Sequence, residues 1–215
     1  MSQPWRLEEL TPQEARERLG ASGRLIVPAG TLEFRGPHLP LGTDTIILNR
    51  LADDLSARTS VVRCPAVPVG ARGGSRKGAA GTAALSRKAL HRMINELIAA
   101  WEEDAGVREV VVLTAHAAEA HLEALGAVRT RGSVRLVDIF ALDFGPLLQR
   151  GGALHGGELD TSLILYMRPD LVQGSAEALA RLGASAERGE RLYHFILDRV
   201  TEHCLPGPVR DLQPV

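Results

Sequence analysis

The sequence predicts an α/β fold, with a mostly parallel sheet flanked by helices. Short apolar runs alternate along the chain with longer stretches of helical periodicity, which is typical of a sheet covered by helices. The 215 residues are 45% hydrophobic, which is enough to bury one sizeable core. No internal repeat or low-complexity segment points to a second unit, so residues 1–215 are predicted to form a single domain.

Each element is predicted from its own pattern. The strands are short runs rich in valine, isoleucine and leucine. The second helix begins after Ser86, a favourable N-cap, and its apolar residues fall on one stripe. The fourth helix stops before Pro169, which cannot continue it. In chain order, the predicted strands are residues 24–27, 61–67, 109–113 and 134–139, and the predicted helices are residues 45–58, 87–104, 118–130, 158–167 and 184–203.

Charge and cysteine content exclude several classes of partner. With 25 basic and 26 acidic residues, the chain has no general field that favours nucleic acid or an anionic membrane. No apolar run is long enough to span a bilayer. Only two cysteines are present, Cys64 and Cys204, and the chain does not open on a charged and then apolar stretch, so we expect a cytoplasmic protein. We therefore expect neither nucleic acid nor a membrane as a partner.

The loop from Gly30 to Asp44 is the most informative segment. It holds Glu33, His38 and Asp44, and it follows an apolar run that reads as a buried strand. Asp44 is expected at the N-cap of the next helix. In open α/β sheets, ligands bind at the carboxyl ends of the strands. Because carboxylates and imidazoles are ligands of divalent ions, the loop is suited to hold a cation.

This loop resembles that of the creatininase family of metal-dependent amidohydrolases, which usually reads Glu-Gln-His-Gly-Pro-His-Leu-Pro-Leu-x-Thr-Asp. Phe34 and Arg35 replace the Gln-His pair, so the chain is similar to a divergent member. Two further family segments follow in order, around His116 and from His155 onward. The resemblance runs from about residue 24 to 167, and it implies a creatininase-like fold.

The resemblance also implies a metal site. Glu33, Asp44 and His116 match the ligands of the family's first metal, and Asp44 also matches the residue that bridges to the second. The other two positions of the second metal are occupied here by Arg35 and Asp160. The expected cofactor is therefore one divalent ion, most simply zinc, with iron or manganese as alternatives.

Arg35 changes this expectation most. A guanidinium has no lone pair for a cation, so Arg35 cannot replace a histidine ligand. One hypothesis is that its charge takes the place of the second metal and pairs with Asp160 or Asp44, which leaves a mononuclear site. The alternative is that Arg35 points to solvent or to a neighbouring subunit and that the site has decayed.

The remaining candidates surround these ligands. By resemblance, His155 is the general acid and base, and its ordinary pKa near neutrality suits that task. Glu158 is counted with the catalytic residues, although an acidic residue in a first helical turn also fits a structural role. Candidate substrate-binding residues are His38, Arg72, Arg76 and Thr82. The other histidines, His91, His121, His194 and His203, are expected to be structural or exposed.

The sequence therefore predicts a metal-dependent hydrolase of a C–N bond in a small amide, lactam or formamide. One alternative is a metal-poor relative that binds a ligand or partner without turnover. A third reading keeps the pocket for a non-hydrolytic biosynthetic reaction. The family resemblance also implies a homo-oligomer.

Overall fold

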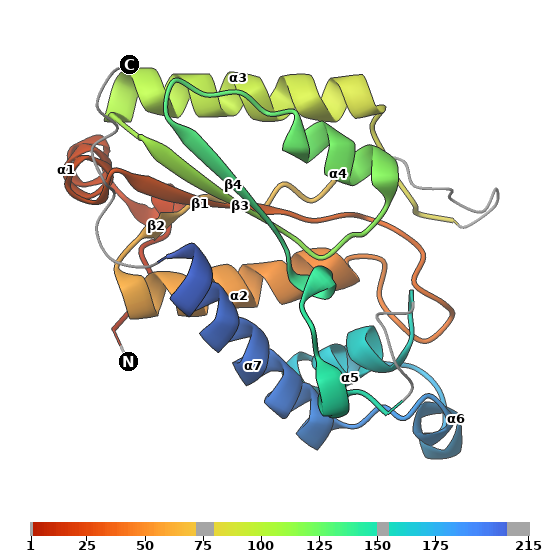
Figure 1. Cartoon of the computed structure of the whole chain (residues 1–215). Coiled ribbons are helices and arrows are strands. Elements are labelled where there is room, and N and C mark those ends of the chain that lie inside the picture. Colours follow the sequence, from red (N-terminus) through yellow and green to blue (C-terminus); the bar gives the residue numbers. More distant parts are fainter. Residues whose placement is uncertain (1, 72–79, 150–154, 206–215) are drawn as a thin grey trace.

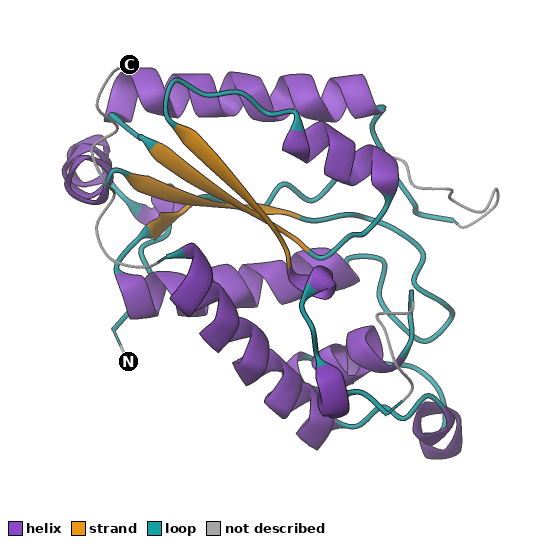
Figure 2. Ribbon diagram, viewed as in Figure 1, coloured by secondary structure: helices purple, strands orange, loops and turns teal. Residues whose placement is uncertain are grey.

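The computed structural model describes residues 2–71, 80–149 and 155–205 and shows one sheet between two layers of helices (Figures 1 and 2). The four strands are all parallel and lie in the order β2-β1-β3-β4. The register places Leu25 beside Val110, and Val110 beside Val134. The predicted α/β class and parallel sheet are confirmed. The strands are β1 (Arg24–Ala29), β2 (Val62–Arg63), β3 (Glu109–Thr114) and β4 (Ser133–Asp138).

The helices divide between the two faces of the sheet (Figure 1). One layer contains α1 (Pro12–Ser22), α3 (Arg87–Ala105) and α4 (Glu119–Gly126). The other contains α2 (Thr43–Thr59), α5 (Glu158–Met167) and α7 (Ala186–Cys204), and α6 (Ala176–Arg181) lies between α5 and α7 in the sequence. Short 3-10 helices are η1 (Leu7–Glu9), η2 (Ile139–Ala141), η3 (Gly145–Leu147) and η4 (Pro169–Leu171). Within the described segments, none of the helices combines the length and apolar character needed to cross a bilayer.

The two central strands explain the layers. Every residue of β1 and of β3 is buried, as expected for parallel strands covered on both faces. Successive side chains point to opposite faces. Ile26 and Val111 therefore belong to the core beneath α2, α5 and α7, whereas Leu25 and Val110 belong to the core beneath α1 and α3.

Some predicted boundaries are wrong. The second strand is reduced to two residues, Val62 and Arg63, because Pro65 has no N–H to donate to a ladder, and the chain pairs with β1 again only at an isolated bridge between Ala29 and Val67. The third predicted helix ends early, at Gly126. Asp44 is not an N-cap: α2 begins at Thr43, after Gly42, so Asp44 lies in the first helical turn.

Two helices, α1 and α6, were not predicted. The start of α1 is a capping box, in which the Thr11 side chain accepts from the Glu14 N–H and the Glu14 carboxylate accepts from the Thr11 N–H. Gly23 ends α1 in the left-handed conformation. These capping signals are local. Hydrophobic periodicity did not predict α1, because only Leu19 of this helix is buried.

Candidate metal and catalytic site

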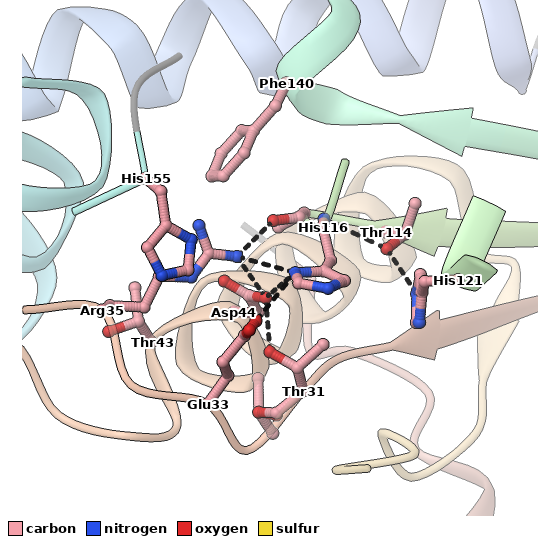
Figure 3. Close-up of polar contacts among 12 residues, drawn as sticks. Thr31, Glu33, Arg35, Thr43, Asp44, Thr114, His116, His121, Phe140 and His155 are labelled. Carbon is pink, nitrogen blue, oxygen red and sulfur yellow. Dashed lines mark hydrogen bonds and ion pairs between the residues drawn. The ribbon is translucent and has the colours of Figure 1, made fainter. Parts of the chain in front are cut away.

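The candidate site lies at the carboxyl ends of β1 and β3. The chain leaving β1 supplies Glu33 and Arg35, and the chain leaving β3 supplies His116. Asp44 comes from the first turn of α2 and Asp160 from the first turn of α5. These five residues, Glu33, Arg35, Asp44, His116 and Asp160, are called the charge cluster below, and Figure 3 shows four of them converging.

Arg35 lies in the centre of the charge cluster, and its side chain is only 4% exposed. Its Nη2 donates to Asp44 Oδ2 at 2.6 Å and to the Ala115 carbonyl oxygen at 3.1 Å. Its Nη1 donates to Asp160 Oδ2 at 3.2 Å. The hypothesis that Arg35 pairs with Asp160 or Asp44 therefore agrees with the geometry, in which it pairs with both, and the solvent-pointing alternative does not.

The pKa values follow from burial and from Arg35. Burial alone would lower the pKa of Arg35, but Asp44 and Asp160 raise it above its usual value, so the guanidinium stays charged. Burial would raise the pKa of Asp44, but His116, Arg35 and the Thr31 hydroxyl hold it below its usual range. For Asp160, burial prevails over Arg35, and its pKa is raised.

The charge cluster has more negative than positive groups, and several of its buried polar atoms have no hydrogen-bond partner. Three carboxylates share one guanidinium. In the described part of the chain, six buried side-chain nitrogen or oxygen atoms have no hydrogen-bond partner, and four of these belong to the cluster. They are Glu33 Oε2, Arg35 Nε, Asp44 Oδ1 and His116 Nε2. Because each such atom costs about 1–3 kcal/mol, their concentration in one place indicates a site for a guest.

The donor types suit one divalent ion. His116 Nδ1 lies 3.3 Å from Glu33 Oε2 and 3.5 Å from Asp44 Oδ2. Two ligands of one tetrahedral zinc lie about 3.4 Å apart, because each lies about 2.1 Å from the metal. However, no three His, Cys, Asp or Glu side chains of the described residues are already gathered around one point. The side chains therefore fit one ion by donor type and pairwise spacing, although an ion must draw them closer together.

A second ion does not fit. Arg35 occupies the space between Asp44 and Asp160, and its charge would repel a neighbouring dication. Its Nη2 also lies 3.2 Å from His116 Nδ1, so the first ion would compete with Arg35 for this nitrogen. The donor set therefore accommodates one ion beside a built-in cation.

His155 lies at the edge of the charge cluster and is exposed. Its Nε2 lies 2.6 Å from the Phe34 carbonyl oxygen, which fixes the ring beside the Glu33–Arg35 segment (Figure 3). Since a carbonyl only accepts, Nε2 carries a proton, and in the neutral ring Nδ1 has the lone pair. The role in proton transfer that the resemblance implies for His155 stays a prediction.

The other predicted residues have different surroundings. The Glu158 carboxylate accepts from the Gln149 N–H at 2.9 Å and pairs with Arg188 of α7, and these contacts favour a structural role over a catalytic one. His38 Nε2 lies 2.9 Å from Thr161 Oγ1, which joins the loop to α5. Thr82 Oγ1 accepts from the Phe34 N–H. Arg72 and Arg76 lie outside the described residues.

Two residues beside the charge cluster were missed. Thr31 donates its hydroxyl to Asp44 Oδ2 at 2.6 Å. His121, expected to be structural or exposed, is fully buried, and its ring meets the ring of His116 edge to face. Burial lowers the pKa of His121 to about 4, so its imidazole is neutral at neutral pH. The available signal was position, because His121 lies in the first turn of the helix that follows the β3 loop.

Comparison with known proteins finds similarity to the creatininase family. The model of the family Creatininase, described as creatinine amidohydrolase, matches residues 8–184. The mycofactocin precursor peptide peptidase of Mycobacterium ulcerans is 30% identical over 185 residues, which cover 77% of this chain and 69% of that protein. The chain thus spans about two thirds of the length of this curated relative.

Solved structures agree on the fold. A structure of creatinine amidohydrolase (creatininase) has a TM-score of 0.78 at 21% identity, and the match covers 95% of this chain and 99% of that chain. A structure described as "Creatininase Mn" also has a TM-score of 0.78 at 21% identity and covers 94% of this chain and 100% of that one. At this level of identity the similarity establishes a common architecture.

Proposed function

This chain belongs to the creatininase family, and on that premise we propose that it hydrolyses a C–N bond with the help of one divalent metal ion. The observation that carries the proposal is that His116 Nδ1 lies 3.3 Å from Glu33 Oε2 and 3.5 Å from Asp44 Oδ2, a spacing that suits ligands of one ion. Three carboxylates facing one guanidinium favour an additional cation. The solved structure "Creatininase Mn" is named for manganese, which supports a divalent ion of this kind.

The residues have separate roles in this proposal. Glu33, Asp44 and His116 hold the ion, and such an ion supplies Lewis acidity, which acidifies water and polarises a carbonyl. Hydrolysis places a hydroxyl on the carbonyl carbon and a proton on the leaving nitrogen. His155 carries that proton, because its Nδ1 lone pair is free to accept it and to return it.

Arg35 substitutes for a second ion in charge only. It neutralises part of the charge of Asp44 and Asp160 and offers no site for a second water. We therefore propose a mononuclear site that uses zinc, with iron or manganese as alternative metals. By family resemblance, we also propose a homo-oligomer.

The substrate is proposed from two directions. A small amide, lactam or formamide is the first candidate class, in keeping with the creatinine amidohydrolase family description. A short peptide is the second candidate, favoured by the 30% identity to a relative named as a precursor peptide peptidase. Both classes share the carbonyl C–N bond that the proposed residues act upon.

The first test is metal content per chain, measured by elemental analysis on protein purified without chelator. We expect about one equivalent in the parent, none in His116→Ala and close to two in Arg35→His. His91→Ala is the matched control, since His91 lies on α3 and contacts the Ala127 carbonyl oxygen, away from the charge cluster. No metal in the parent after reconstitution would contradict the proposal and favour a ligand-binding relative without turnover.

Hydrolysis is then assayed with the metal-loaded protein. A panel of small amides, lactams, formamides and short peptides is followed by the release of amine. Glu33→Ala should lose turnover while the chain stays folded. A product that contains no added water would instead identify a non-hydrolytic reaction in the same site.

A further inference from the structure

Three residues outside the charge cluster contact its proposed ligands. Thr31 donates its hydroxyl to Asp44 Oδ2 at 2.6 Å. The His121 ring lies 5.1 Å from the His116 ring, centroid to centroid, with an angle of 89° between the planes (Figure 3). A Cβ atom added to Gly70 would meet both Thr31 and His121, so this backbone passes close to both side chains. Thr31, Gly70 and His121 are called the brace below.

The backbone at Gly70 connects the other two members of the brace, Thr31 and His121. A Cβ atom at this position would lie 2.7 Å from Thr31 Cγ2 and 2.7 Å from His121 Nδ1, which is closer than real contacts allow. The backbone therefore passes between the two side chains with no room to spare. The carbonyl oxygen of Gly70 accepts from the Leu85 N–H at 2.9 Å, so the segment is held from its other side as well.

Hydrogen bonds fix the tautomer of His121. The Ala71 N–H donates to His121 Nδ1 at 3.2 Å, so Nδ1 carries no proton and Nε2 is the protonated nitrogen. Nε2 faces Thr114 Oγ1 at 3.0 Å, and the same oxygen accepts from the His116 N–H at 3.3 Å. His121 is thus linked to His116 by ring contact and through Thr114.

The side chains of Thr31 and His121 cannot rotate freely. Thr31 is 4% exposed and His121 is fully buried. Thr31 Oγ1 holds the oxygen of Asp44 that also faces Arg35, and His121 supports one side of the His116 ring. A rotation of either side chain would displace a proposed ligand, since close-packed interiors leave no free volume for it.

We infer that the brace sets the orientation of Asp44 and His116 and thereby determines the metal affinity of the site. The inference rests on the proposed function, because it takes Asp44 and His116 as ligands. The members of the brace are positioning residues that do not touch the ion. Loss of such a supporting contact typically weakens metal binding about 10- to 100-fold.

The test measures the dissociation constant for zinc by competition with a chelator. Thr31→Val, which removes only the hydroxyl, and His121→Phe, which keeps a ring but removes both polar atoms, should each weaken binding about 10- to 100-fold. Thr31→Ser keeps the hydroxyl and should restore the parental affinity. The control is Tyr193→Phe, which removes a buried hydroxyl that joins α7 to Asp54 of α2. This contact lies outside the brace, so the variant should leave the zinc affinity unchanged.

Stability and spectroscopy separate positioning from general damage. The free energy of unfolding is measured without metal for every variant. If Tyr193→Phe is destabilised as much as Thr31→Val or His121→Phe and loses the same zinc affinity, the inference is overturned. In ¹⁵N NMR of the histidine rings, His121 should carry its proton on Nε2. A proton on Nδ1, or parental zinc affinity in Thr31→Val and His121→Phe, would also overturn it.

Failure of the proposed function is distinguishable. If the parent protein binds no zinc, the proposed metal site is contradicted. The brace is then tested separately, by the ring resonances of the Gly70→Ala variant. This variant should shift the ring resonances of both His116 and His121. Gly20→Ala, at a position where a Cβ meets nothing within 4 Å, should shift neither. Unchanged ring resonances in Gly70→Ala would overturn the inference.

Discussion

Arg35 Nη2 lies 2.6 Å from Asp44 Oδ2, and both side chains are withdrawn from solvent. The pair joins the loop after β1 to the first turn of α2, and a second contact from Arg35 reaches Asp160 in α5. One guanidinium thus connects three segments that lie far apart in the sequence. Its contribution differs from that of an exposed ion pair, because its removal leaves buried carboxylates without a cation.

Arg35→Met should destabilise the metal-free protein by about 3–5 kcal/mol, because Asp44 and Asp160 lose their shared partner. Urea unfolding gives this difference in free energy. Arg92→Met, which removes an exposed pair with Glu96, should unfold at nearly the parental urea concentration. A loss below about 1 kcal/mol in Arg35→Met would show that the buried pairs are not stabilising.

Asp53 should make the stability depend on pH. Burial raises its pKa, but hydrogen bonds from Arg6 and Arg63 bring it below the usual value of 3.8. The folded state therefore gains stability above that value and loses it as the pH falls through the lower, folded pKa. Asp53→Asn should be less stable than the parent by about 1 kcal/mol at pH 7, and the difference should shrink below about pH 4. A constant difference between pH 7 and pH 3 would contradict this account.

Gly156 should tolerate no side chain. It has a φ of +67°, and an added Cβ would fall on the carbonyl oxygen of Arg35. Gly156→Ala should therefore cost more than the roughly 1 kcal/mol of backbone strain and should reduce metal content, because Arg35 and Glu33 must shift. Gly106→Ala has nearly the same φ, +66°, but open space for the Cβ, so it isolates the strain alone. Equal unfolding midpoints for the two variants would argue against a steric role for Gly156.

The two cysteines should differ in reactivity. Burial raises the pKa of Cys64 to about 12, whereas Cys204 is only partly buried. The thiolate is the reactive form, so iodoacetamide at pH 8 should label Cys204 first and Cys64 only after unfolding. Peptide mass spectrometry distinguishes the two sites. Rapid labelling of Cys64 in the folded protein would show that the buried segment after β2 opens readily.

The sequence was sufficient for the parallel sheet because β1 and β3 are continuous apolar runs, and their burial on both faces requires helices on both sides. The prediction failed for β2, where prolines interrupt an apolar run, and for α1, whose helix is specified by its caps and not by a strong stripe. Periodicity reports burial, and elements with few buried residues leave a weak signal.

The candidate site was only partly predictable. The sequence motifs pointed to Glu33, Asp44, His116 and Asp160, and the pairing of Arg35 with the aspartates was one of two hypotheses. Sequence could not place Thr31 and His121 beside them, because Thr31 reaches Asp44 across a loop of irregular structure and His121 meets His116 only through the turn between β3 and α4. Glu158 was assigned by its position in a motif, and its contact with Arg188 on a distant helix could not be read from the sequence.

The four unpartnered atoms of the charge cluster also make thermal stability a sensitive detector of whatever the protein binds. A guest that binds at the charge cluster stabilises the folded chain alone, by an amount that grows with the logarithm of its concentration over its dissociation constant. A collection of metal salts and amide compounds can therefore be ranked by melting temperature, with no assay of turnover. The Arg35→Met and His116→Ala proteins, measured on the same plate, would mark the compounds that bind elsewhere.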